Sequence, residues 1–513
     1  MKVLNWGVAI IGVMCVTSLS GRAQGSFEEF RKQAEAKFEN FRKEADEKYE
    51  NFRRKANEDY AAFLEKAWRG VDSKPPVKRP KEDPPVVPPP PAPIKDDKPI
   101  KDDKPVKDSE QPIKDKEVVI KDVVKPAPKP EPRPEPVEPI VVKPQPQVAQ
   151  HEFMCYGTPM KVRLGKEHAF KLGGADNAAV SRGWKILSDD KYDALIADCL
   201  ALREKHNLSD WHYLRMLKAM AQSFLGDTNE ATLLMAYVYS QSGYKMRMAS
   251  AAGKLYMCFA SKHVIYGESY YQLDGVNYYV LDGKGDRISM SDAAFPNEKA
   301  MSLYITGEPM LAREAAAERK LKSAMYPAMA FDVAVNKNLI DVYGDYPTSE
   351  IGGDFMTRWA MYASTPMGKD VSSRLYPAIK KTIEGKSEAE AVQMILNWVQ
   401  TAFVYELDDK VWGGDRAFFA EETLYYPYCD CEDRSILFSR IVRDLLGLDV
   451  MLVYYPGHLA TAVRFSSGDV KGDFLTLDGK RYVVCDPTFI NARVGMTMPG
   501  MNNASARAIV LPK

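Results

Sequence analysis

A proline-rich stretch divides this chain of 513 residues into parts that must fold separately. Between residues 73 and 147 the sequence is dominated by proline and charged residues, as in PPVVPPPPAP and KPAPKPEPRPEPVEP. A segment of this composition buries too little apolar surface to offset the chain entropy lost on folding. We therefore predict an extended, disordered linker over residues 71–149, with a helical element before it and the globular part after it.

An 11-residue repeat precedes the linker, and its first copy is FEEFRKQAEAK from Phe27. Aromatic residues occupy repeat positions 1 and 4, alanine occupies position 8, and most other positions are charged. A period of about 3.67 residues per turn places these positions on one helical face. We predict a helix over residues 24–70 that self-associates through residues 27–67. Docking of the same face on the chain's own globular part, or on a membrane surface, is the alternative.

The first 23 residues have the pattern of a secretory signal peptide, in which Lys2 precedes a short apolar run and GRA ends at Ala23. No later stretch is apolar enough to predict a transmembrane segment. We therefore expect an exported protein, whether periplasmic, in the cell envelope or secreted. The formal net charge of +0 argues against a general affinity for nucleic acid. Seven cysteines are too sparse for a disulfide framework.

Two cysteines lie close together in YYPYCDCEDRSILFSRIV, which spans residues 425–442. The apolar periodicity from Cys431 predicts a helix that ends at Gly447, so Cys431 lies near the helix N-terminus. There the helix dipole and free backbone N–H groups favour a thiolate, and we expect the pKa of Cys431 to be lowered. Further on, His458 opens a strand after the apolar run DVMLVYY, and Asp486 ends the last strand of a hairpin.

His458 follows Cys431 by 27 residues, and Asp486 follows His458 by 28. With the motifs DCEDRSILFSRIVRDLLG, GHLATAV and RYVVCDPTF, this order resembles the transglutaminase-like superfamily of cysteine enzymes, whose core is papain-like. The resemblance extends from about residue 385 to the C-terminus. It implies a catalytic domain over residues 371–513 with Cys431 as nucleophile, His458 as base and Asp486 orienting the imidazole. The backbone N–H of Cys431 and the side chain of Tyr428 are candidate oxyanion donors.

The same residues also have structural interpretations, because a lone cysteine is often a small buried hydrophobe. We expect Cys429 to be a packing residue on the loop before the helix. Cys485 should point to the opposite face of its strand from Asp486. That alternation, and the single residue between Cys429 and Cys431, argue against a zinc site made with His458. We expect no metal and no cofactor.

Residues 150–290 repeat the order helix, strand and hairpin in GDTNEATLLMAYVYSQSGYKMRM and YYQLDGVNYYVLDG. Alignment of DT with DC places Thr228 opposite Cys431, Lys254 opposite His458 and Asp282 opposite Asp486. We interpret this region as a degenerate transglutaminase-like lobe that lacks the thiol and the imidazole. Chance recurrence of the element order is the alternative.

The predicted fold is therefore α+β, with a transglutaminase-like core that is duplicated and joined by a β-rich segment over residues 291–370. Within that segment we predict a helix over residues 312–325 and strands in residues 328–347 and 355–365. Residues 387–405 should form a helix with Ser387 as its N-cap. The predicted function is an exported cysteine peptidase, amidase or acyl transferase that acts on a peptide or protein amide. The alternative is a non-catalytic binding or assembly protein of the cell envelope.

Overall fold

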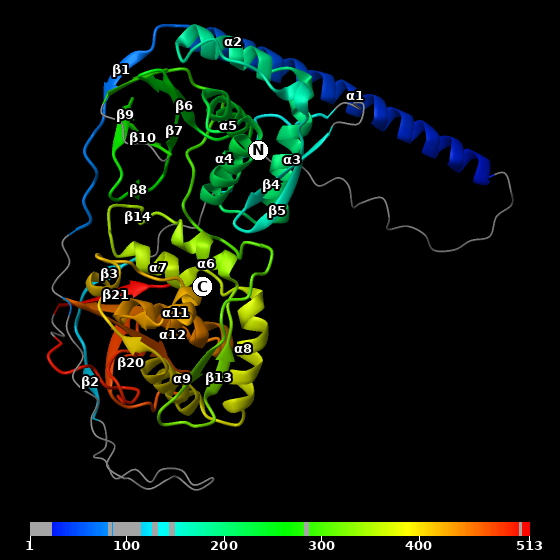
Figure 1. Cartoon of the computed structure of the whole chain (residues 1–513). Coiled ribbons are helices and arrows are strands. Elements are labelled where there is room, and N and C mark those ends of the chain that lie inside the picture. The colour runs from blue at the N-terminus through cyan, green and yellow to red at the C-terminus, as the bar shows by residue number, and fades with distance from the viewer. Residues whose placement is uncertain are drawn as a thin grey trace.

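The computed structural model describes residues 23–80, 85, 114–125, 132–142, 149–281, 287–501 and 505–512, with side chains from residue 31 onward. The chain forms two mixed α+β lobes, one above the other in Figure 1. One cluster of buried apolar side chains includes Trp184, Tyr343 and Ile436, so the two lobes share a core. Residues 1–22 of the expected signal peptide, and Asp282, lie outside the described residues. Export therefore stays a prediction.

An antiparallel sheet forms the centre of the first lobe, in the order β1-β11-β6-β7-β10-β9. Its strands are β1 (Arg69–Asp72), β11 (Arg287–Met290), β6 (Met246–Ala251), β7 (Lys254–Ala260), β10 (Val276–Val280) and β9 (Tyr270–Leu273). Helix α5 (Asn229–Gln241) packs on β6 and β7, and α4 (Asp210–Leu225) packs on α5. Leu234 of the helix and Leu255 of the sheet lie in the same buried cluster, which explains why the helix is apolar on nearly every side.

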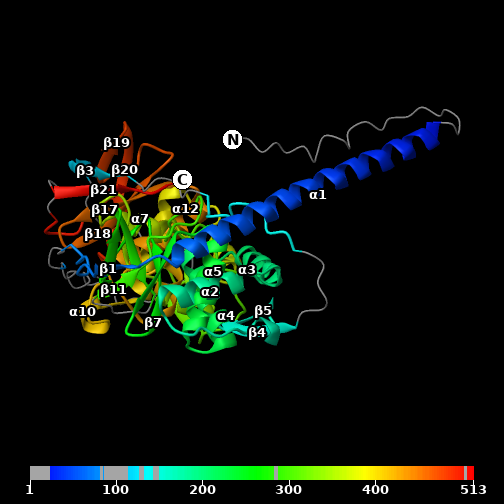
Figure 2. The same ribbon diagram turned by 90° about the horizontal axis from the view of Figure 1, so that it is seen from above.

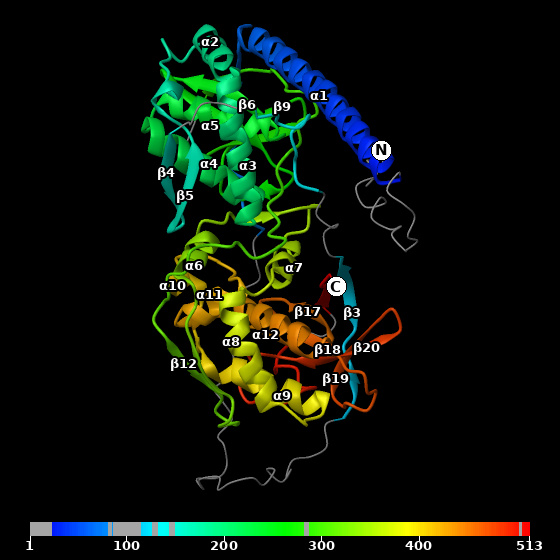
Figure 3. The same cartoon turned by 90° about the vertical axis from the view of Figure 1, so that its right-hand side faces the viewer.

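The second lobe contains a larger sheet, in the order β2-β19-β20-β18-β17-β21-β3. Its strands are β2 (Lys116–Glu117), β19 (Asp473–Leu477), β20 (Lys480–Cys485), β18 (His458–Arg464), β17 (Asp449–Tyr455), β21 (Ala506–Val510) and β3 (Ile120–Val124). Helix α12 (Cys431–Leu446) packs on β17, β18 and α9 (Glu388–Ala402). Figure 3 shows α12 beside this sheet, with α9 next to it.

The two sheets share a core of five strands in one order, β11-β6-β7-β10-β9 in the first lobe and β21-β17-β18-β20-β19 in the second. In each lobe a helix precedes the central hairpin in sequence and packs on it. Both hairpins turn through a glycine with positive φ, Gly253 at 77° and Gly457 at 76°, a conformation that glycine adopts without strain. This common topology supports the proposal that the lobes are copies of one ancestral unit.

The 11-residue repeats form one long helix, α1 (Ala23–Leu64), and its two ends differ. Tyr60, Ala61 and Leu64 are buried against the first lobe, where the Tyr60 ring lies 4.6 Å from that of Trp184. The other end projects away from the lobes in Figure 2, and Phe38 and Phe41 are 68% and 69% exposed. The last repeats therefore dock on the chain's own globular part, whereas self-association through the earlier repeats stays a prediction.

The expectation of a disordered linker over residues 71–149 is wrong for several of its described parts. Residues 69–72 form β1 at the edge of the first sheet, and β2 and β3 form the two edges of the second sheet. Pro134 accepts a hydrogen bond of 2.8 Å from Arg203. Sheet edges offer unpaired backbone N–H and C=O groups, so a polar segment can be held by backbone pairing without an apolar core of its own.

The connecting segment over residues 291–370 is less β-rich than expected. Its elements are β12 (Arg319–Lys322), β13 (Ala330–Val333), α6 (Lys337–Gly344), β14 (Ser349–Glu350) and α7 (Thr357–Ser364). The predicted helix over residues 312–325 is replaced by extended chain and β12, which pairs with β13. The predicted strand over 355–365 is the helix α7. Pairing and packing between distant segments outweigh local propensity in both places.

The prediction of a helix from residue 387 is confirmed by α9, because the Ser387 side chain accepts from the Glu390 N–H and the Glu390 carboxylate accepts from Ser387. In the part of the chain that the structure covers, none of the helices is both long and apolar enough for a membrane crossing.

The remaining elements are β4 (Gln150–Cys155), β5 (Thr158–Arg163), α2 (Asn177–Leu187), α3 (Asp193–Lys205), β8 (Val264–Ile265), α8 (Lys369–Thr382), β15 (Val404–Tyr405), α10 (Asp408–Val411), α11 (Ala420–Tyr425), β16 (Tyr428–Cys429) and two 3₁₀ turns, Lys166–His168 and Asp190–Tyr192.

Candidate active site

Cys431 is the first residue of α12, and a capping box fixes the helix start around it. The Asp430 carboxylate accepts from the Glu432 N–H at 3.2 Å, and the Asp433 carboxylate accepts from the Asp430 N–H at 3.2 Å. Two backbone N–H groups that a helix start would leave unpaired are satisfied in this way. The Cys431 side chain is therefore held in one place at the end of a buried helix, with 7% of its surface exposed.

His458 is the first residue of β18, directly after the turn that Gly457 makes possible. It is paired across the hairpin with Tyr455, and the two rings stack at 6.5 Å. Asp486 follows the last residue of β20, the neighbour of β18 in the sheet. The pairing of β18 with β20 therefore places Asp486 next to His458, although 28 residues separate them in sequence.

His458 Nε2 lies 2.8 Å from Asp486 Oδ2, and both side chains are buried. The other carboxylate oxygen of Asp486 accepts from the N–H groups of Thr488 and Phe489 at 2.9 and 3.2 Å. A carboxylate can only accept, so Nε2 of a neutral His458 carries the hydrogen and Nδ1 presents its lone pair. Nδ1 is buried and has no hydrogen-bond partner among the described side chains.

Cys431 and His458 line the same cavity, whose volume is about 390 Å³. The thiol of Cys431 donates to Glu432 Oε2 at 3.5 Å. The backbone N–H of Leu459, the residue after His458, donates a hydrogen bond to the sulfur, which favours the thiolate. Cys431 at the start of a helix and His458 at the start of a strand are therefore brought to one cavity. The thiol is hydrogen-bonded to Glu432 in this structure, and it makes no hydrogen bond to His458 Nδ1.

The electrostatic surroundings of Cys431 differ from the expectation of a thiolate stabilised by the helix dipole. Burial raises the pKa of Cys431 well above its usual value, and the carboxylates of Asp430 and Glu432 raise it further. Burial and neighbouring carboxylates also raise the pKa of Glu432, and that of Asp408 to about 7. The prediction of a lowered pKa for Cys431 is wrong in this conformation, because burial and adjacent negative charges outweigh the helix dipole.

The other predicted residues lie away from this arrangement. Cys429 is buried, its sulfur accepts from Arg434 Nε at 3.4 Å, and burial raises its pKa. Cys485 is buried one residue before Asp486, and its sulfur donates to the Val483 carbonyl at 3.7 Å. Tyr428 is 41% exposed and is not among the residues that line the cavity, which gives no support to it as an oxyanion donor.

The first lobe has different chemistry at the equivalent positions, and the alignment shifts by one residue. Thr228 is the N-cap of α5, so it corresponds to Asp430, and Asn229 corresponds to Cys431. The Asn229 amide donates to the Gly253 carbonyl and accepts from the Leu255 N–H, each at 2.9 Å. Both bonds flank Lys254, the first residue of β7, which is exposed and corresponds to His458. An amide satisfied by backbone groups therefore stands where the second lobe has its thiol.

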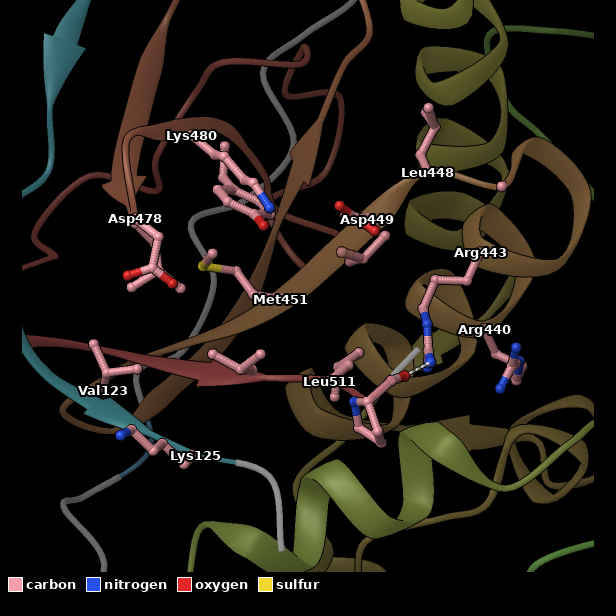
Figure 4. A pocket seen from close by; sticks show the side chains of 16 residues that line it. Val123, Lys125, Arg440, Arg443, Leu448, Asp449, Met451, Asp478, Lys480 and Leu511 are labelled. Carbon is pink, nitrogen blue, oxygen red and sulfur yellow. Dashed lines mark hydrogen bonds between the residues drawn. The ribbon is translucent and has the colours of Figure 1, made fainter. Parts of the chain in front are cut away.

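A larger cavity of about 680 Å³ lies at the opposite end of α12 (Figure 4). The lining comes from the end of α12, from β17 and from the chain near β3, with Arg443 bound to the carbonyl of Pro512. Charged residues of both signs face it, including Lys480 and Asp449. Among the residues that line it there is no cysteine or histidine, so it offers no nucleophile and base of the kind present around Cys431.

The acidic lining of the Cys431 cavity is not predicted from the sequence, and neither is the contribution of Arg79 and Pro80, which lie in the predicted linker. The acids next to Cys431 were visible in the motif DCED. In contrast, Asp408, Asp415 and Arg79 are distant in sequence and have no motif that would join them to the site.

No protein-family model matches the chain, and no curated protein matches it. A crystal structure of a protein from Parabacteroides distasonis, described there as a "putative protease", matches 49% of this chain and 44% of its own chain, at 12% identity and a TM-score of 0.19. The match thus spans less than half of that protein, and at this level of similarity it supports no conclusion about activity.

Proposed function

We propose that the protein is a thiol-dependent enzyme that cleaves peptide-like amides through the residues Cys431, His458 and Asp486. One observation carries the proposal: Asp486 binds His458 through Nε2, Nδ1 of the same ring is buried and has no partner among the described residues, and His458 lines the same cavity as Cys431. The proposal is also supported by the sequence resemblance to the transglutaminase-like superfamily, which implies these three residues in these roles.

In the proposed reaction the Cys431 thiol gives its proton to His458 Nδ1 as the sulfur attacks the carbonyl carbon of the amide. The positive charge that develops on the imidazole is stabilised by the Asp486 carboxylate. The oxyanion forms beside the first backbone N–H of α12, at the positive end of the helix dipole. The proton then passes from His458 to the leaving nitrogen, the C–N bond breaks, and a thioester remains on Cys431.

Water completes the cycle, because His458 takes a proton from it while the oxygen attacks the thioester. The C–S bond breaks, the sulfur recovers a proton from His458, and a carboxylic acid leaves. An amine in place of water would give acyl transfer by the same steps. Hydrolysis is the simpler proposal, since water is present at about 55 M and needs no second binding site.

The rival proposal is a non-catalytic binding protein, and it is favoured by the burial of Cys431 and by the acids that raise its pKa. The test compares alkylation of Cys431 by iodoacetamide in the wild type and in His458→Ala, with the modified peptide mapped by mass spectrometry. His263→Ala is a matched control, because His263 is a buried histidine of the first lobe.

Slower labelling of Cys431 in His458→Ala, with no change in His263→Ala, supports the enzyme. Hydrolysis of a mixture of peptide amides that disappears in Cys431→Ser supports it independently. Labelling that is indifferent to His458, together with no Cys431-dependent hydrolysis, would leave the binding protein as the better explanation.

A further inference from the structure

The chain that follows β1 runs from the first lobe into the cavity of Cys431. Lys74 exchanges two backbone hydrogen bonds with Tyr270, at 2.7 and 3.3 Å, and Val77 accepts from the Gly267 N–H at 3.1 Å. Arg79 and Pro80 then line the cavity itself. We call residues 73–80 the strap, and it is held by backbone pairing up to the point where it reaches the site.

Arg79 is the end of the strap that enters the site. Its guanidinium donates to Asp415 Oδ2 at 3.1 Å, to the Asp415 carbonyl, and to Thr348 Oγ1 at 2.9 Å. Arg79 and Asp415 also line a second cavity of about 550 Å³, so this ion pair borders both cavities. At 38% exposure the Arg79 side chain is accessible to solvent and can be displaced.

The cavity around Cys431 is strongly acidic. Asp408, Asp409, Asp415, Asp430 and Glu432 line it, and Arg79 is the one lysine or arginine among its described lining residues. Carboxylate oxygens of Asp408, Asp415 and Glu432 lie within 4.8 Å of one another. Glu432 Oε1 is buried and has no hydrogen-bond partner in the described part of the chain. Crowded, buried carboxylates repel one another, so a cation placed among them is favourable.

An aromatic wall adjoins these acids. Trp359 and Tyr454 line the cavity, and their rings stack at 5.6 Å with 28° between the planes. The methylene stem of a long basic side chain packs well on such a surface while its charged end reaches acids beyond it. The cavity therefore matches lysine or arginine better than a small ammonium ion.

We propose that this cavity binds a lysine or arginine side chain of a peptide substrate beside Cys431, and that Arg79 of the strap is an internal competitor which the substrate displaces. The proposal rests on the proposed amide-cleaving function and names the substrate class of that site. The strap thereby makes the cavity selective, since an occupant must replace Arg79 beside Asp415, which keeps a second ion pair with Arg358 at 3.4 Å.

The experiment measures how peptides protect Cys431 from iodoacetamide in the full-length protein. N-acetyl-Arg-Pro-amide is compared with the same peptide carrying citrulline, which has arginine's shape without its charge. Protection by the arginine peptide is expected at an about tenfold lower concentration, as one charge-assisted hydrogen bond accounts for a difference of this size. Arg79→Gln should move protection by the arginine peptide to a still lower concentration. Lys78→Gln, a change in the adjacent exposed strap residue, should not.

Asp415→Asn and Glu432→Gln should reduce the difference between the two peptides. Equal protection by arginine and citrulline would overturn the proposal, even where Cys431 reacts through His458 and the proposed function stands. Conversely, a clear arginine preference, together with labelling that is indifferent to His458→Ala and no Cys431-dependent hydrolysis, would retain the basic-side-chain site and reject the enzyme. The two claims therefore fail separately.

A divalent cation is the rival occupant of the carboxylates. Protection of Cys431 by millimolar CaCl₂ or MgCl₂ that also abolishes the effect of the arginine peptide would assign the acids to a metal and overturn the proposal. Where Cys431 resists alkylation altogether, the two peptides are compared by their shift of the thermal unfolding midpoint. A larger shift with arginine than with citrulline supports the proposal, and equal shifts overturn it.

Discussion

Asp486 Oδ2 lies 2.8 Å from His458 Nε2, and both side chains are fully buried. The carboxylate of Asp486 is also fixed by two backbone N–H groups, from Thr488 and Phe489, so it holds the imidazole in one orientation. As a result Nε2 is occupied by the carboxylate, whereas Nδ1 has no partner among the described residues, in a residue that lines the same cavity as Cys431.

Replacing Asp486 by alanine should slow the alkylation of Cys431 by about tenfold, because an unoriented imidazole accepts the thiol proton less well. The unfolding free energy should also fall by about 1–3 kcal/mol, since buried donors lose their acceptor. Labelling kinetics and urea unfolding measure the two effects. Asp486→Asn is the informative comparison, because asparagine has nearly the same volume as aspartate. Its amide N–H₂ is a donor, and it can face His458 Nε2 where the carboxylate accepts a hydrogen bond. Unchanged labelling in both variants would contradict the positioning role.

The pH dependence of Cys431 labelling should reveal the acids around it. The pKa of Cys431 is raised by burial and by the carboxylates of Asp430 and Glu432, so the thiolate fraction at neutral pH is small and the labelling rate should rise with pH above 7. At pH values where Glu432 is ionised, Glu432→Gln removes its negative charge, which lowers the pKa of Cys431 and increases the labelling rate. Glu384→Gln, at an exposed position, is the control. A pH–rate profile that does not move in Glu432→Gln would contradict this account of the site.

Local signals placed the predicted site residues on their elements, and the roles assigned to them stay predictions. Helical periodicity set the start of α12 at Cys431, and Asp-Pro set the end of β20 within one residue, because the strand ends at Cys485. In the first lobe the predicted equivalent of Cys431 is wrong by one residue. Thr228 is the N-cap of α5, and Asn229 takes the position of Cys431. A sequence pattern alone does not separate the cap from the first helical residue.

Other errors come from contacts between distant segments. The stretch over residues 355–365 alternates like a strand, yet it forms α7, where the buried Arg358 guanidinium lies 3.6 Å from the Phe355 ring and 4.1 Å from that of Trp359. The strap was assigned to a disordered linker because its composition is polar. Its order comes from backbone pairing with Tyr270 and Tyr266, which composition does not encode.

The acidic cluster should make the protein less stable as the pH rises. Burial raises the pKa of Asp408 to about 7, whereas in the unfolded chain it is about 3.9. Between these values the folded state binds a proton that the unfolded state does not, so the stability contributed by this proton is present below about pH 4 and is lost as the pH rises to 7. Asp408→Asn should flatten the dependence between about pH 4 and 7, with a gain on the order of 1–3 kcal/mol at the upper end. Urea unfolding at several pH values tests it, and parallel curves for the two proteins would contradict it.

The exposed part of α1 offers a test of self-association that leaves the docked part intact. Phe38→Ser with Phe41→Ser removes two large exposed apolar side chains, so any oligomer held by this face should shift towards monomer in sedimentation velocity. Arg42→Ser with Lys43→Ser is the matched double change on the same turn of the helix. Stability should not change in either variant, because neither pair contacts the globular part in the described structure. Identical sedimentation of wild type and the phenylalanine variant would reject self-association through these repeats.

The first lobe should prove silent in chemistry and important in stability. Thr228 caps α5, since its hydroxyl accepts from the Ala231 N–H at 3.2 Å and donates to the Leu225 carbonyl. Thr228→Ala should therefore lower the unfolding free energy by about 1 kcal/mol and leave the labelling rate of Cys431 unchanged. Asn229→Ala should cost more, about 1–3 kcal/mol, because it leaves the backbone groups of Gly253 and Leu255 without partners. Urea unfolding gives both values and iodoacetamide labelling gives the rate. Hydrolysis of peptide amides that is lost in a folded Thr228→Ala variant, and kept in Cys431→Ser, would show instead that the reactive group belongs to the first lobe.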